Sequence, residues 1–290
     1  MNPSILKTAA VVLLFGFLCF LPARAANAIE LKKEAAAAYD RYIAASEAKM
    51  KREIQNGPFL FVDALPENSR RDAYAELRGG EVQTMRRNTD QQGQPALAAQ
   101  ALIHDWIGVV FIPNVSLAQA LGVVQDYGNY QDYYKPGMRH SRVISRTDDK
   151  FDVSLQLYRK SVITVVVNAE FEIEYRRLGA SRVVTHSRAT RLAEVQNAGQ
   201  PGEHELPPGA SHGLIWRLND YWRFEEKDGG VYVQLESIGL SRSVPSFVAW
   251  LVNPLLNSIP RGVLLNLLST TRTAVVNSRK AAANPDKSAP

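Results

Sequence analysis

The chain has 290 residues, of which 46% are hydrophobic and 22% are charged, and its formal net charge is +5. These values are ordinary for a globular protein, and the length suffices for one large domain or two small ones. The weak net charge, with signs that alternate along the chain, excludes the strongly basic character typical of nucleic-acid-binding proteins.

The first 25 residues have the pattern of a secretory signal peptide. Lys7 precedes an apolar run from Ala9 to Leu21, and Ala23-Arg24-Ala25 has the small-x-small form of a cleavage site. The run spans about 13 residues, whereas a membrane-spanning helix needs about 20. We therefore expect cleavage and a periplasmic or secreted bacterial protein; an uncleaved anchor is the alternative.

Removal of residues 1–25 would also remove the single cysteine, Cys19. The mature chain is then predicted to have no disulfide and no thiolate chemistry. It would keep 32 basic and 29 acidic residues, a net charge of +3.

Residues 26–99 are predicted to form an N-terminal helical extension. The stretch 29–56 is rich in Ala, Glu and Lys, has no Pro or Gly, and is followed by Gly57-Pro58. This composition predicts a helix. A second helix is expected at 67–77, and a strand at 81–88 after a glycine turn.

From residue 102 the pattern is that of a sheet with two helices. A strand over 102–113 is followed by a helix over 117–134, which Asn114 or Ser116 can cap. Six strand-like segments follow, with turn residues between most of them: 138–146, 150–160, 161–177, 181–195, 214–226 and 230–242. Residues 199–213 have the composition of a loop.

A long apolar helix is predicted near the C-terminus, over residues 245–277. Pro254 is expected to kink or split it, and Pro260 suits a first helical turn. The tail, residues 279–290, is predicted to be disordered. This order of elements predicts an α+β fold in which a curved antiparallel sheet wraps around one helix and leaves an internal space.

The segments GLIWRLNDYWRFEEKDGGVYVQLESIGLSRSVP and WLVNPLLNSIPR, in this order of elements, resemble secreted bacterial members of the START-like helix-grip (SRPBCC) superfamily. That superfamily includes birch-pollen-type allergens, lipid-transfer START domains and polyketide cyclases. The resemblance covers about residues 100–278. It implies a hydrophobic cavity between the sheet and the C-terminal helix, with a lipid or another apolar small molecule as partner. It supplies no universal catalytic motif, so no catalytic residue and no cofactor is assigned.

Two-residue alternation along 214–226 predicts one apolar face and one solvent-exposed face. Asp220 is the ionisable exception on the apolar face, unless a bulge turns it outward. Candidate lining residues are Trp216, Leu218, Trp222, Phe224, Phe171, Ile173, Tyr175, Tyr158, Tyr130, Tyr134, Trp250, Leu264 and Leu268. Candidate partners for a ligand head group are Arg159, His186 and Arg188, although alternation leaves open which face of the strand with His186 points inward.

Other chemistry has little support in the sequence. There is no nucleotide-binding glycine motif, no GxSxG and no paired His or Cys spacing for a metal. His104 and Asp105 are adjacent on a strand and must point to opposite faces. Glu170, Glu172 and Glu174 are expected on an outer face with cross-strand ion pairs.

We therefore predict non-covalent binding or transport of a hydrophobic molecule. A cyclase or dehydrase acting in the same cavity is one alternative. A structural envelope protein, with helix 29–56 as its partner-binding element, is another. The apolar stretch 247–256 is also a candidate for a gate and for transient membrane contact.

Overall fold

The computed structural model describes residues 30–87, 101–160, 164–207, 210–243 and 246–283, with side chains described outside 246–259 and 281–283. The predicted signal peptide lies outside these residues. Within the part that is described, no helix is both long and apolar enough to cross a membrane.

An antiparallel sheet of nine strands forms the centre of the molecule. Eight strands lie in the order β1-β2-β9-β8-β6-β5-β4-β3, and β7 pairs with β6. The bounds are β1 Gln83–Arg86, β2 Ala101–Pro113, β3 Met138–Arg146, β4 Lys150–Lys160, β5 Thr164–Arg177, β6 Arg182–Gln196, β7 His204–Glu205, β8 Arg217–Lys227 and β9 Gly230–Arg242.

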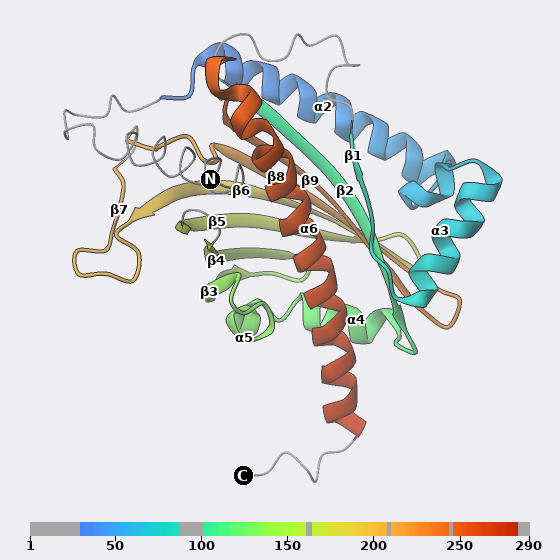
Figure 1. Ribbon diagram of the computed structural model, residues 1–290. Helices are drawn as coiled ribbons and strands as arrows, with labels where there is room; N and C mark the ends of the chain where they lie inside the picture. The colour runs from blue at the N-terminus through green and yellow to red at the C-terminus, as the bar shows by residue number, and fades with distance from the viewer. Residues whose placement is uncertain (1–29, 88–100, 161–163, 208–209, 244–245, 284–290) are drawn as a thin grey trace, which may run out of the picture.

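The helices lie on both faces of this sheet. They are α2 Lys33–Asn56, η1 Phe61–Ala64, α3 Glu67–Gly79, α4 Leu117–Val124, η3 Tyr127–Asn129, α5 Tyr130–Tyr133 and α6 Ser246–Ala283. Figure 1 shows the long helix α6 running across the sheet. We call the face that packs against α6 and α4 the α6 face, and the opposite face, against α2, η1 and α3, the α2 face. The predicted α+β helix-grip architecture is confirmed.

Local signals explain most of the elements. Six strands were predicted after residue 138 and all are present, while β8 and β9 are joined at Asp228 and Gly229, both with positive φ. Ser116 caps α4 in a capping box with Gln119. The helix predicted over 117–134 is in fact divided into α4, η3 and α5; Gly128, a poor helix former, lies in this stretch.

Helix α6 differs from its prediction at both prolines and at its end. It is continuous through Pro254 and Pro260 and runs to Ala283, past the predicted start of the tail. An interior proline costs a helix about 3 kcal/mol, so the packing of Leu264, Leu268 and neighbouring residues must offset that cost. The rest of the predicted tail lies outside the described residues.

The N-terminal segment packs on the α2 face. Its helix α2 buries Ala35, Tyr39, Tyr42 and Met50 against strands β2, β8 and β9. Strand β1 extends the sheet by pairing with β2. The apolar side of α2 is therefore covered by the sheet of the same chain.

Candidate ligand site on the α6 face

One half of the α6 face is closely packed. The tyrosines Tyr127 and Tyr175 share a hydrogen bond between their hydroxyls at 2.6 Å, and the hydroxyls of Tyr134 and Thr271 lie 3.0 Å apart. The hydrophobic core on this face contains eight of the predicted lining residues, each at most 8% exposed: Phe224, Phe171, Ile173, Tyr175, Tyr130, Tyr134, Leu264 and Leu268. They are brought together, but as core beneath the C-terminal half of α6.

A glycine allows α6 to approach the sheet this closely. A Cβ on Gly108 of β2 would lie 2.9 Å from Leu268 Cδ1 and 3.1 Å from Leu264 Cδ2. A Cβ there would force the side chains of Leu264 and Leu268 to shift, and it would also lie 3.1 Å from the backbone carbonyl oxygen of Gln83.

The other half of the α6 face is more open. Along β2 and β8 the inward side chains of Trp106, Leu218 and Trp222 are only partly buried, as is Leu192 on β6. Gly262 of α6 lies above the end of this half, since a Cβ there would be 3.2 Å from Arg159 Nη2. These large apolar side chains therefore pack against the core but keep part of their surface exposed.

Polar groups lie among these apolar side chains. Asp220 Oδ1 is buried and has no hydrogen-bond partner among the described residues. Burial raises the pKa of Asp220 to about 6, while a hydrogen bond with Ser237 acts in the opposite direction. On β2, His104 Nε2 lies 2.9 Å from Ser241 Oγ, and burial lowers the pKa of this histidine to about 4.

Four candidates for the site lie on the opposite face: Trp216, Tyr158, His186 and Arg188. Trp216 packs in the cluster under α2, because it precedes β8, and strand alternation does not extend to it. Tyr158 lies beneath the guanidinium of Arg139 and lines a surface pocket of about 720 Å³ beside α5. His186 stacks on Tyr221, with ring centroids 4.7 Å apart.

Of the head-group candidates, only Arg159 points to the α6 face, where its Nε is buried without a hydrogen-bond partner in the described part of the chain. Arg188 instead donates to Glu172 at 2.6 Å on the outside. Trp250 lies outside the residues whose side chains are described.

The expected outer face of β5 is confirmed. Glu172 and Glu174 pair with Arg188 and Lys150, and Glu170 lies 4.0 Å from Arg191. Asp105 lines the α2 face while His104 lies on the α6 face, so the two adjacent residues point apart as alternation requires.

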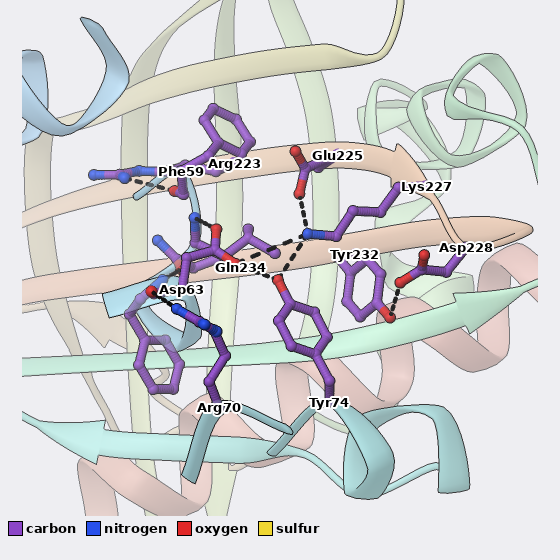
Figure 2. Close-up of polar contacts among 12 residues, drawn as sticks. Phe59, Asp63, Arg70, Tyr74, Arg223, Glu225, Lys227, Asp228, Tyr232 and Gln234 are labelled. Carbon is purple, nitrogen blue, oxygen red and sulfur yellow. Dashed lines mark hydrogen bonds and ion pairs between the residues drawn. The ribbon is translucent and has the colours of Figure 1, made fainter. Parts of the chain in front are cut away.

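The second face of β8 was wrongly expected to be exposed to solvent. Asn219, Arg223 and Glu225 are buried, at 6%, 3% and 4% exposure. Figure 2 shows why: Arg223 donates to the carbonyl of Phe59 at 2.7 Å, and Lys227 reaches the neighbouring elements. These polar side chains attach η1 and α3 to the sheet.

Members of this network also pair with one another. Lys227 Nζ lies 2.8 Å from Glu225 Oε2 and donates to the hydroxyl of Tyr74 at 2.7 Å (Figure 2). The amide of Phe61 donates to Gln234 Oε1 at 2.6 Å. We therefore assign it a structural role.

Trp106, Leu192, Ser237 and Ser241 were missed by sequence reasoning. The alternation of Leu102, His104 and Trp106 along β2 could have identified Trp106 as an inward-facing residue. In the described residues, no group of three or more His, Cys, Asp or Glu side chains is placed to hold a metal ion.

No protein-family model and no curated protein matches the sequence. Solved structures do match. In fold, the chain is similar to START-like helix-grip proteins. A STAR-related lipid transfer protein from Xanthomonas axonopodis is 16% identical, with 68% of this chain and 93% of that chain covered and a TM-score of 0.44.

Two further structures show the same range of similarity. Human STARD10 is 9% identical, with 76% of this chain and 83% of that chain covered and a TM-score of 0.45. The Zhui aromatase/cyclase from Streptomyces sp. R1128 is 9% identical, with 62% and 96% covered and a TM-score of 0.42. At such identities and TM-scores, the ligand and activity of this chain have to be inferred from its own residues.

Proposed function

We propose that the protein binds an apolar small molecule or lipid, non-covalently, on the open half of the α6 face. The observation that carries this proposal is the partly exposed inward row of Trp106, Leu218 and Trp222 next to Asp220 Oδ1, which is buried and has no hydrogen-bond partner among the described residues. Burial of apolar surface contributes about 25 cal/mol per Å², so covering about 200 Å² would supply about 5 kcal/mol. Asp220 Oδ1 is placed to contact a polar group of the ligand.

Native mass spectrometry of protein purified from its own host is the direct test, because a bound lipid adds a defined mass. Delipidated protein should then bind the extracted molecule. Trp222→Ala should weaken binding about tenfold, since a buried indole contributes more than 1.4 kcal/mol.

Trp216→Ala is the matched control, because Trp216 lies six positions away along the chain but packs under α2. It should leave the affinity unchanged while both variants keep the circular dichroism of the wild type. Equal losses in the two variants, or a host-purified protein of unmodified mass that takes up no host lipid, would rule the proposal out.

Acid–base catalysis is a second candidate, and Asp220 is the observation that favours it. Its raised pKa, about 6, lets the carboxyl exchange a proton near neutral pH inside an apolar site. A cyclase or dehydrase would convert the bound molecule, and Asp220→Asn would abolish conversion while leaving binding intact. Recovery of unchanged ligand after long incubation would refute catalysis and leave non-covalent binding as the only proposed function.

We also propose a periplasmic or secreted location, on the signal-like pattern of residues 1–25. N-terminal sequencing of protein from its host should begin at Ala26. A mature chain that still begins at Met1 would contradict this. Membrane contact by residues 247–256 stays a prediction, which vesicle flotation with and without bound lipid would check.

A further inference from the structure

A second pocket, of about 460 Å³, lies on the α2 face, on the other side of the sheet from the proposed ligand site. Helix α2 forms one wall, and strands β1, β2 and β9 form the others. Its lining residues are Tyr42, Ser46, Lys49, Met50, Glu53, Met85, Arg86, Arg87, Asp105 and Glu236.

Two carboxyl groups lie side by side at the sheet wall of this pocket. Asp105 is 2% exposed and Glu236 is 5% exposed. In the β2–β9 register Asp105 is opposite Ile238 and Glu236 is opposite Ile107, so the two carboxyls are diagonal neighbours on one face. Burial first, and then the charge of Glu236, raise the pKa of Asp105 to about 7.

The two carboxylate oxygens of Asp105 differ in their surroundings. Its Oδ2 accepts a hydrogen bond from the Tyr42 hydroxyl at 2.6 Å, whereas its Oδ1 is buried and has no hydrogen-bond partner among the described residues. A buried polar atom left in this way costs about 1–3 kcal/mol. It is therefore a place where a donor from a ligand would gain free energy.

The other acids around the pocket form ion pairs. The charges of Arg87 and Lys49 also act on Asp105 and oppose part of the rise in its pKa, and Arg87 Nε is buried with no hydrogen-bond partner among the described residues. Arg87 Nε lies 3.5 Å from Glu236, and Lys49 lies 3.9 Å from Glu53, which also accepts from Arg223 at 2.7 Å. Arg86 takes part in interactions of its own. Asp105 is thus the acid in this pocket for which no ion pair is formed within the described part of the chain.

We propose that this pocket binds a small molecule through a primary ammonium group, which donates to Asp105 Oδ1 and lies beside Glu236. An ammonium carries three donors and no acceptor, so it satisfies the free oxygen and also offsets the repulsion between the two carboxyls. A neutral donor would do only the first. The side chains of Met50 and Met85 supply apolar contact for the carbon chain that carries the amine.

Calorimetric titration with putrescine tests the proposal, with butanediol as the uncharged control of the same length. Putrescine should bind at about pH 8.5 and weaken about tenfold per pH unit below pH 7, because the ammonium competes with the proton on Asp105. Binding at about pH 6 should release close to one proton, which appears as a dependence of the heat on the ionisation enthalpy of the buffer.

Asp105→Asn should reduce the affinity at least tenfold. Asp40→Asn should not change it, because Asp40 is an exposed residue of α2 that does not line the pocket. If Asp105→Asn fails to fold, proton release by the wild type still decides. Equal binding of butanediol, absence of proton release at about pH 6, or a folded Asp105→Asn with wild-type affinity would each overturn the proposal. Tighter binding of the amino acid lysine than of putrescine would support it and identify amino acids as the source of the amine.

Discussion

Replacing Asp220 with Asn should change stability in a way that depends on pH. The pKa of Asp220 is about 6 in the folded protein, against an ordinary value of 3.8. The folded state therefore holds this proton more tightly than the unfolded state, so wild-type stability falls as pH rises from about 4 to about 6 and stays lower above that. At about 1.36 kcal/mol per unit of pKa, the charge of Asp220 costs the folded state about 3 kcal/mol at neutral pH.

The measurement is urea unfolding of ligand-free wild type and Asp220→Asn at about pH 8 and about pH 4. The amide of the new Asn has its own cost, but this cost is the same at both pH values. The difference between the two proteins should thus shift by about 2.4 kcal/mol in favour of Asn at the higher pH, because the unfolded carboxyl is already partly ionised at about pH 4. Asp105 and Glu236, whose pKa values are also raised, are common to both proteins and cancel.

The exposed Asp40 on α2 supplies the control, since Asp40→Asn should give a shift below about 0.5 kcal/mol. A stability difference between wild type and Asp220→Asn that is the same at both pH values would refute the reasoning. It would mean that Asp220 is solvated, and that the open half of the α6 face does not desolvate a charge.

Three further changes address packing and buried hydrogen bonds. Gly108→Ala should destabilise the fold by about 1–3 kcal/mol in urea unfolding, because the new Cβ meets Leu268. Gly122→Ala is the control and should not destabilise the fold, because the space around its Cβ position is open. Equal effects of the two substitutions would contradict the contact with Leu268. Glu194→Gln should cost about 2 kcal/mol and speed hydrogen exchange in residues 211–214, because this buried carboxylate accepts four hydrogen bonds from that loop. Its pKa is lowered, so this contribution should disappear as pH falls through the folded-state pKa, and a pH-independent loss would argue against it. Tyr42→Phe should cost about 1–2 kcal/mol and weaken the docking of α2, measured as faster exchange of α2 amides; unchanged exchange would show that its bond to Asp105 does not hold the helix.

The strands and their turns were accessible from the sequence because their causes are local. Alternation of apolar and polar residues, β-branched runs and the turn at Asp228-Gly229 act over a few neighbouring residues. The same local rule correctly separated Leu218 and Trp222 from Arg223, and it singled out Asp220 as the ionisable residue on the apolar face.

Only the tertiary structure decided what each face contacts. The polar face of β8 is buried because Arg223 binds the carbonyl of Phe59, 164 residues earlier in the chain. His186 faces α2 for a similar reason, since Tyr221 and Asn219 of β8 hold it there. Two-residue alternation defines two faces, but it carries no information on which face a distant segment will cover. That choice depends on the total burial and hydrogen bonding that α2 and α6 gain on opposite sides of the sheet, which no short stretch of sequence contains.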